Sequence, residues 1–249
     1  MEKRDKWSEH CAVPFSSIDA SGTMTASAIF HFFQEAAIAH AENLGVGREA
    51  MAHENQLWIL SRMSVQVDQR PLYENTITVN TWPRGAQKLV VLRDYDIRDA
   101  LGVPMVRARS NWIIIDQEKR RPLRPQTLME TMPLNEGSDA LPTALGLEER
   151  KVLQKKMERR AMYNDIDYNG HVNNVSYIRW IEDALDPLLL QNAKRMRLDI
   201  NYLGEIAYNT NVSIWMANID EADADAFAFE GRKEPDNQAA FRAELRLWH

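Results

Sequence analysis

Two stretches of the chain decide its fold: "SIDASGTMTASAIFHFFQEAA" at residues 17–37 and "DIDYNGHVNNVSYIRWIEDAL" at residues 165–185. When they are aligned at an offset of 148 residues (165 minus 17), Asp19 meets Asp167, and a glycine follows three positions later in both stretches. A register shared over about 20 residues indicates an internal duplication, in which one supersecondary unit is used twice.

Both stretches predict a helix. They place apolar residues at i, i+3 and i+4, which is one helix face: Ile29, Phe32 and Phe33 in the first stretch, and Tyr177, Trp180 and Ile181 in the second. In the first half, Thr25 or Ser27 can cap a helix that runs to about Leu44 and ends at Gly45.

The second helix is expected to begin at Asn173 or Asn174, because asparagine is a favoured N-cap residue. It is expected to end near Pro187, where a proline interrupts the helical pattern. Each half of the chain therefore contains one helix of the duplicated unit.

Four stretches with strand character follow each expected helix. Their apolar and polar residues alternate, as in antiparallel strands with one buried face. They cover residues 57–68, 76–82, 89–99 and 104–116 in the first half, and residues 196–203, 210–220, 225–231 and 239–249 in the second. The predicted fold class is therefore α+β, with two antiparallel sheets joined edge to edge, each wrapped around its own helix.

A segment with four prolines between residues 122 and 142 separates the two halves. Proline-rich segments between periodic elements indicate linkers. We therefore expect an N-terminal unit over residues 1–125, a linker over residues 126–150 and a C-terminal unit over residues 151–249.

The composition excludes several classes of protein. A net charge of −6 argues against nucleic acid as the main partner, and no apolar run approaches the ~18 residues of a membrane span. The N-terminus is charged rather than apolar, and Cys11 is the single cysteine, so we expect no secretory signal and no disulfide within the chain. These features predict a cytoplasmic protein. We expect neither a cofactor nor a metal ion.

The two copies of the duplicated stretch differ at informative positions. Asn169 and His171 of the second copy stand where the first copy has Ser21 and Thr23. The first copy therefore lacks the titratable histidine. We expect any active site to lie in the second half.

The polar residues of the second copy suit attack by water on a carbonyl group. Asp167 and His171 can act as base or acid near neutral pH. The amide of Asn169 can donate to a developing oxyanion, as can free N–H groups at a helix start. A thioester fits well, because a thiol with a pKa near ~8.5 leaves without strong acid assistance. The alternative is that the aspartates and asparagines only cap the helix and that His171 is an ordinary surface or core residue.

The segment around His171 closely resembles the catalytic segment of acyl-acyl carrier protein thioesterases, the plant fatty-acyl enzymes and their bacterial relatives. The family reads D-x-D-x-N-x-H-V-N-N-x-x-Y, and all eight specified positions match: Asp165, Asp167, Asn169, His171, Val172, Asn173, Asn174 and Tyr177. Four stretches of the first half are also similar to the family, at residues 57–71, 81–85, 93–99 and 110–122. The resemblance thus covers the chain from about residue 10 to its C-terminus.

The resemblance implies a tandem double hotdog in one chain, with the acyl group sheltered mainly by the N-terminal half. It implies that Asp167, Asn169 and His171 carry catalysis. It also points to an acidic residue 34 positions after the histidine, which is Glu205 in this chain, either as the base that activates water or as a support for Asp167.

One departure from the family concerns a cysteine. Plant members carry a cysteine directly after this glutamate, where this chain has Ile206, and Cys11 is a poor substitute. The departure disfavours a covalent cysteine mechanism and favours attack by water.

We therefore expect a thioester hydrolase that releases free fatty acid from fatty acyl-acyl carrier protein and so ends chain elongation. Two alternatives stay open: an acyl-CoA thioesterase on the same fold, and a non-catalytic acyl-binding hotdog protein. The oligomeric state stays open between a homodimer and a monomer, whose two halves already supply the pairing of a single-hotdog dimer.

The acidic carrier protein would need a local basic surface on this acidic chain. Three basic clusters could provide it, or could be ordinary solvated charge: Lys119, Arg120, Arg121 and Arg124; Lys151, Lys155, Lys156, Arg159 and Arg160; and Lys194, Arg195 and Arg197.

Overall fold

The computed structural model describes residues 2–130, 132–137, 139–219, 222 and 224–249. The N-terminal half contains β1 (Trp7–Ala12), α1 (Ala26–Leu44), α2 (Arg48–His53), β2 (Gln56–Val67), β3 (Thr76–Gln87), β4 (Val90–Arg98), β5 (Pro104–Asp116), β6 (Pro122–Leu123) and α3 (Gln126–Met129). The C-terminal half contains β7 (Gln154–Arg160), α4 (Asn174–Asp183), α5 (Pro187–Asn192), β8 (Arg195–Tyr202), β9 (Asn211–Ile219), β10 (Asp225–Lys233) and β11 (Gln238–Trp248).

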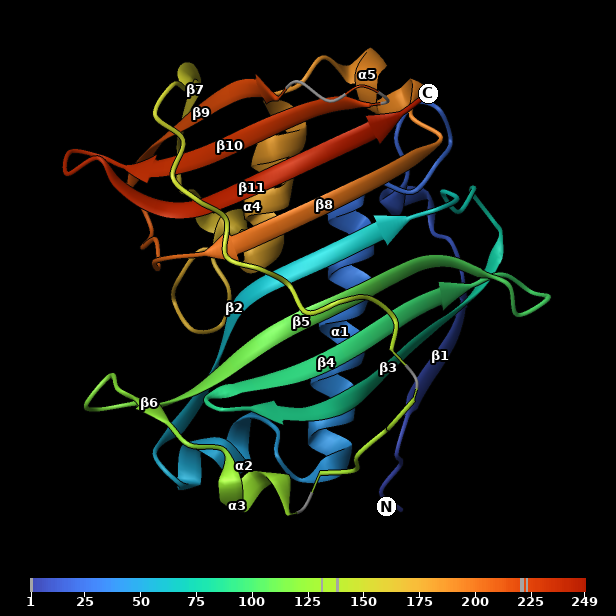
Figure 1. Ribbon diagram of the computed structural model, residues 1–249, viewed down its shortest axis with the longest axis vertical. Helices are drawn as coiled ribbons and strands as arrows, with labels where there is room; N and C mark the ends of the chain where they lie inside the picture. Colours follow the sequence, from blue (N-terminus) through green and yellow to red (C-terminus); the bar gives the residue numbers. More distant parts are fainter. Residues whose placement is uncertain (1, 131, 138, 220–221, 223) are drawn as a thin grey trace.

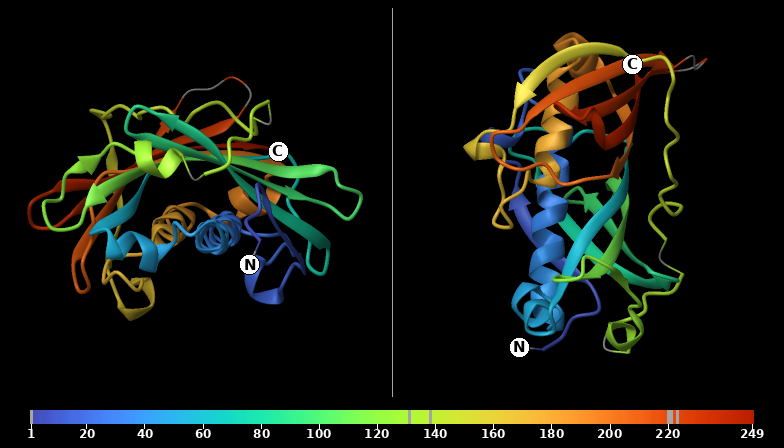
Figure 2. Two further views of the ribbon diagram at one scale, coloured as in Figure 1. Left: turned by 90° about the horizontal axis from the view of Figure 1, so that it is seen from below. Right: turned by 90° about the vertical axis from the view of Figure 1, so that its left-hand side faces the viewer.

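The strands of the described residues form one antiparallel sheet of eleven strands, in the order β1-β3-β4-β5-β2-β8-β11-β10-β9-β7, with β6 paired to β5. The halves join where β2 pairs with β8, with Val65 opposite Leu198. The two long helices, α1 and α4, lie on one face of this curved sheet (Figures 1 and 2). The α+β prediction of two sheets joined edge to edge, each around its own helix, is confirmed.

The N-terminal half has two strands more than the sequence predicted, of which β6 is a two-residue strand paired to β5, and the C-terminal half has one more. The other two missed strands, β1 and β7, precede α1 and α4 and form the two outer edges of the sheet. β7 reads "QKKMERR", and five of its seven residues are exposed. Polar, lysine-rich strands are typical of protected sheet edges, and they lack the apolar alternation by which a strand is recognised in a sequence.

The start and end of α1 are set by its capping residues. The Thr25 hydroxyl accepts a hydrogen bond from the Ala28 N–H at 3.1 Å. The helix ends at Gly45, whose φ of 74° is in the left-handed region that glycine adopts without strain. The predicted boundaries of this helix are confirmed.

The second helix is shorter than predicted. Asn173 caps α4 by accepting from the Val175 N–H at 2.8 Å. The helix ends at Asp183, before the predicted end near Pro187, and that proline instead takes the first position of α5. Proline is favoured there because the first turn of a helix needs no N–H from it. The predicted strand over residues 210–220 extends to a residue outside the described ones.

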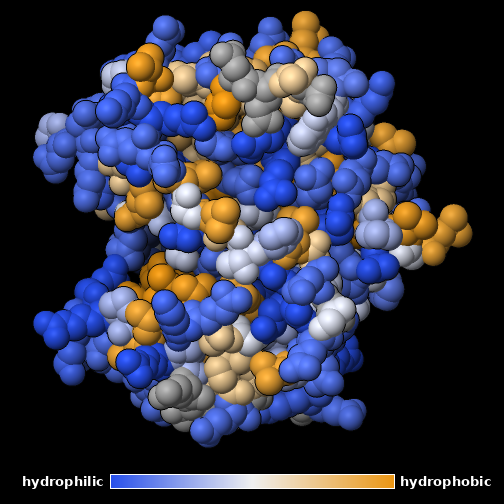
Figure 3. Space-filling model, in the orientation of Figure 1, coloured by the Kyte–Doolittle hydropathy of each residue, from blue (hydrophilic) through white to orange (hydrophobic). Residues whose placement is uncertain are grey.

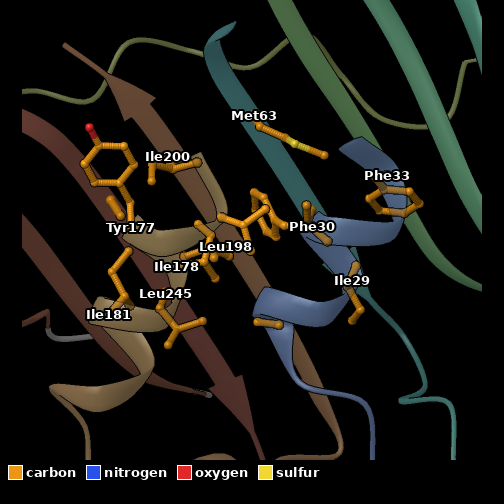
Figure 4. Close-up of a cluster of buried hydrophobic side chains, with 14 of the residues drawn as sticks. Ile29, Phe30, Phe33, Met63, Tyr177, Ile178, Ile181, Leu198, Ile200 and Leu245 are labelled. Atoms are coloured by element: carbon orange, nitrogen blue, oxygen red, sulfur yellow. The ribbon is translucent and has the colours of Figure 1, made fainter. Parts of the chain in front are cut away.

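One hydrophobic core spans both halves. Ile29, Phe30 and Phe33 of α1 pack with residues of α4 and of the central strands (Figure 4). The labelled partners are Met63, Tyr177, Ile178, Ile181, Leu198, Ile200 and Leu245. The core therefore fixes α1 and α4 against each other.

The predicted linker, residues 126–150, crosses the face of the sheet opposite the helices (Figures 1 and 2). Two of its positions, 131 and 138, lie outside the described residues. Asp139 forms ion pairs with Arg84 and Arg109, and Asn201 of β8 donates to the Leu145 carbonyl at 3.1 Å. The segment is thus bonded to both halves of the sheet.

No described helix is both long enough and apolar enough to cross a lipid bilayer. Hydrophilic residues cover most of the visible outer face of the sheet (Figure 3).

Candidate active site

The catalytic candidates begin on a closed turn just before α4. The Asp167 N–H donates to the His171 carbonyl at 2.8 Å, and the Gly170 N–H donates to the Asp167 carbonyl at 3.0 Å. Gly170 has a φ of 80°, which a side chain would strain. The turn therefore brings Asp167, Asn169 and His171 together.

A second segment of the chain brings Glu205 to this turn. His171 pairs with Ala207 as an isolated β-bridge, and the Val172 N–H donates to the Ile206 carbonyl at 2.8 Å. The His171 Nε2 consequently lies 3.5 Å from the Glu205 Oε2, and each side chain is 38% exposed. The backbone pairing thus forms a solvent-accessible histidine–carboxylate pair.

Asp167 and Asn169 are joined through the backbone. The Asn169 N–H donates to the Asp167 Oδ1 at 2.8 Å, while the Asn169 side chain is exposed and makes no hydrogen bond with other described residues. No lysine or arginine within the described part of the chain forms an ion pair with Asp167. Its carboxylate is thus half-buried and without a cationic partner.

Tyr177 of α4 is buried within electrostatic range of both carboxylates. Burial raises the pKa of its hydroxyl well above the ordinary value, and the negative charges of Asp167 and Glu205 raise it further. The phenol therefore stays protonated and remains a hydrogen-bond donor. Tyr177 belongs to the family motif, but from the sequence it was expected only on the apolar face of the helix.

Residues outside the predicted set also contact the site. Arg120, in the turn between β5 and β6, donates to the Glu205 Oε1 at 2.5 Å. Arg48 of α2 stacks on the ring of Tyr168, with its guanidinium carbon 3.4 Å from the ring centroid. Lys233 donates to the Glu205 carbonyl at 3.4 Å. The two arginines come from the N-terminal half, so both halves build the site.

The three predicted basic clusters differ in what their residues contact. In the first cluster, only Arg120 contacts a predicted site residue, while Lys119, Arg121 and Arg124 are exposed beside it. In the second cluster, Arg159 is paired with Asp183 at 2.5 Å. In the third, Arg197 is paired with Asp199 at 2.9 Å.

The matching turn of the N-terminal half has the same backbone and different chemistry. The Asp19 N–H donates to the Thr23 carbonyl at 2.9 Å, as Asp167 does to its counterpart. Arg70 takes the place of Glu205, because Met24 bonds to Pro71 as Val172 bonds to Ile206. The Arg70 guanidinium is 5% exposed and pairs with the Asp19 Oδ2 at 2.6 Å.

The N-terminal pair joins a buried guanidinium to a partly exposed carboxylate. Burial alone would raise the pKa of Asp19, but hydrogen bonds from Ser21 and Arg70, with the charge of Arg70, lower it overall. Arg70 also donates to the Met24 carbonyl at 3.1 Å and to the Leu190 carbonyl at 2.8 Å. The first copy of the turn is therefore a structural ion pair.

Neither a metal-binding cluster nor a thiol is found at the catalytic turn among the described residues. No cluster of three or more histidine, cysteine, aspartate or glutamate residues in the described ranges is arranged to hold a metal ion. Cys11 lies half-buried on β1 in the other half, where burial and then the charge of Glu9 raise the pKa of its thiol. Ile206, in the position of the plant cysteine, is fully buried.

Two family models match the chain in succession. The acyl-ACP thioesterase N-terminal domain matches residues 4–128, and the acyl-ACP thioesterase C-terminal domain matches residues 148–246. The chain belongs to the acyl-ACP thioesterase family. Its two matched regions correspond to the two copies of the duplicated unit.

Curated relatives of this acyl-ACP thioesterase family member are plant proteins. The palmitoyl-acyl carrier protein thioesterase of Cuphea hookeriana is 29% identical over 205 residues, which are 76% of this chain and 49% of the relative. The oleoyl-acyl carrier protein thioesterase 2 of Arabidopsis thaliana is 25% identical over 227 residues, which are 82% and 61% of the two chains. The chain thus spans about half the length of the curated relatives it matches.

Solved structures share the whole fold. An acyl-ACP thioesterase from Bacteroides thetaiotaomicron superposes with a TM-score of 0.84 at 23% identity, covering 98% of both chains. The 12:0-ACP thioesterase from Umbellularia californica gives a TM-score of 0.81 at 18% identity, covering 98% of this chain and 97% of that one. The double hotdog fold is therefore confirmed.

Proposed function

We propose that the protein hydrolyses the thioester of fatty acyl-acyl carrier protein and releases free fatty acid. The observation that carries this proposal is the contrast between the two turns. In one half this backbone holds Asp19 paired to the buried Arg70 guanidinium, and in the other it holds Asp167 beside the accessible His171–Glu205 pair. Only the second arrangement offers acid, base and amide groups to a substrate.

Asp167 is the proposed base. Both oxygens of Glu205 are occupied, by Arg120 at 2.5 Å and by His171 at 3.5 Å, whereas Asp167 has no ion-pair partner among the described residues. A carboxylate that no cation holds has an oxygen available to accept a hydrogen bond from water. Glu205 in this scheme orients His171.

The reaction then follows in two steps. The oxygen of a water molecule bonds to the thioester carbon while Asp167 takes its proton, and the Asn169 amide donates to the resulting oxyanion. The carbon–sulfur bond then breaks, the sulfur takes up a proton from His171, and the carrier thiol leaves. Solvent restores the proton on His171, and Asp167 releases its own, so that water and thioester give fatty acid and thiol.

The carrier protein is the proposed partner because exposed cations lie beside the site. Arg120 touches Glu205, and Lys119, Arg121 and Arg124 are exposed on the same segment. Acyl carrier proteins are acidic, so this segment is complementary in charge. A cytoplasmic location and a homodimer remain further proposals.

The test compares one acyl chain on carrier protein and on CoA. We expect faster release from the carrier protein, and little release by Asp167→Ala or His171→Ala. Ser21→Ala and Thr23→Ala, at the twin positions, serve as controls that keep activity. Preference for CoA would support an acyl-CoA thioesterase instead, and an inert wild type would support a non-catalytic acyl-binding protein.

A further inference from the structure

The N-terminal half holds a carboxylate at the start of its helix. The Ser27 N–H, in the first turn of α1, donates to the Oε1 of Glu182 from α4 at 3.1 Å. Burial raises the pKa of Glu182, and hydrogen bonds from Ser27 and from the Ala26 N–H partly offset that effect. A side-chain oxygen from one helix thus occupies the N-terminus of the other.

The geometry of the helix pair locates the counterpart of this contact. α1 and α4 run in opposite directions, with their N-terminal parts side by side (Figures 1 and 2). Seven residues forward from Ser27 is Gln34, and seven residues back from Glu182 is Val175. Because residues of packed antiparallel helices meet in reverse order, we expect Gln34 beside the first turn of α4.

The internal duplication gives the same result. The offset of 148 residues makes Val175 the equivalent of Ser27 and Glu182 the equivalent of Gln34 (27 plus 148, and 34 plus 148). Phe30 and Ile178, which pack in one cluster, lie within this overlap (Figure 4). Applied to the Ser27–Glu182 contact, the antiparallel helix pair and the duplication therefore both point to Gln34 at the helix start that follows the catalytic turn.

Gln34 is not needed to cap that helix. The Val175 N–H already bonds to the Asn173 side chain at 2.8 Å. Gln34 is half-buried, and its amide makes no hydrogen bond with the other residues that the structure describes. A half-buried amide without a partner is available to a ligand.

We propose that the Gln34 amide donates to the thioester carbonyl oxygen, together with Asn169, and stabilises the oxyanion. This inference rests on the proposed function. A neutral amide can donate to a developing negative charge, whereas the carboxylate of Glu182 in the other half would repel it. The start of α4, after the catalytic turn, is thus matched with glutamine, whereas the start of α1 is matched with the Glu182 carboxylate. Gln34 becomes a catalytic residue contributed by the N-terminal half.

The test measures kcat and KM for Gln34→Met and Gln34→Glu on fatty acyl-carrier protein. Loss of one oxyanion donor lowers kcat about 100-fold or more and leaves KM nearly unchanged. The ratio of the Gln34→Glu kcat to the wild-type kcat should rise as pH falls toward about 4–5, because a carboxyl group is protonated there and can donate a hydrogen bond. A purely structural role would not produce this recovery.

Two controls separate this inference from the proposed function. Glu35→Gln, on the exposed neighbouring position of α1, and Glu182→Gln, at the twin position, should keep wild-type kcat. If wild type hydrolyses the substrate but both Gln34 variants keep its kcat, the inference is wrong and the proposed function stands. If wild type is inert, the proposed function itself fails.

Discussion

The turn at residues 17–25 and the turn at residues 165–173 have the same backbone and opposite uses. In each, the N–H of an aspartate closes the turn, and a glycine with positive φ follows it. The first turn pairs Asp19 with the buried Arg70 guanidinium, and the second leaves the side chains of His171 and Glu205 38% exposed. The comparison teaches that duplication supplied the frame, and that a few side chains decide whether it stabilises or reacts.

The difference is one of solvation. Breaking a buried ion pair by removing one partner is costly, because the other charge stays desolvated. Exposed pairs contribute little to stability, because water screens and replaces them. Stability should therefore depend on the first turn, and activity on the second.

The largest effect is expected from Asp167→Asn. Loss of the proposed base should lower acyl release about 1,000-fold or more, because an amide does not accept the water proton. Thermal unfolding should stay close to wild type, since the carboxylate has no ion-pair partner among the described residues. Rates of fatty acid release measure the effect, and activity near wild type would remove Asp167 from the mechanism.

The second effect is on stability and falls on the other turn. Asp19→Ala leaves the buried Arg70 guanidinium without its carboxylate and should cost about 3 kcal/mol in free energy of unfolding. Glu205→Ala, at the exposed pair, should change this free energy by less than about 1 kcal/mol. Denaturant unfolding of both variants gives the comparison, and equal losses would contradict it.

A buried histidine in the N-terminal half should make the stability of the protein depend on pH. His40 is fully buried, and burial, followed by the charge of Arg93, lowers its pKa to about 4. The unfolded chain takes up the proton first, at about pH 6.5, so stability is complete above that pH and is lost as pH falls toward 4.

The protonation of His40 should lower the free energy of unfolding by an amount on the order of 2–3 kcal/mol. His40→Gln should flatten the fall in unfolding free energy between about pH 6.5 and 4. His31→Gln, at an exposed position of α1, should leave the pH dependence unchanged. A wild-type slope in His40→Gln would show that another group titrates.

The smallest effect concerns Arg120, which links the N-terminal half to Glu205. Arg120→Ala should lower kcat/KM for the carrier-bound substrate about 10-fold, by loosening Glu205 and removing a surface charge. Arg120→Lys should restore part of the loss. Arg121→Ala, at the neighbouring exposed position, is the matched control and should lose about twofold or less.

Local patterns predicted much of the fold. The repeat, the helix starts at Thr25 and Asn173, and the central strands follow from periodicity and capping. β1 and β7 were missed because edge strands are polar, and the end of the second helix was misplaced because Pro187 starts a new helix.

The site was only partly predictable. Asp167, Asn169 and His171 stand within one turn, and comparison with the first copy of that turn identified them as candidates. Glu205 came only from the family resemblance, because a β-bridge between distant segments brings it near. Arg120 reaches the site across the junction of the two halves, which no local pattern records.

The most direct test of the account converts the catalytic turn into its twin. The double variant Asn169→Ser with His171→Thr carries the residues of the N-terminal turn on an unchanged backbone frame. The account predicts that release of fatty acid from acyl-acyl carrier protein falls about 1,000-fold or more, while the midpoint of thermal unfolding stays within a few degrees of wild type. A folded double variant that releases fatty acid at the wild-type rate would contradict the central claim.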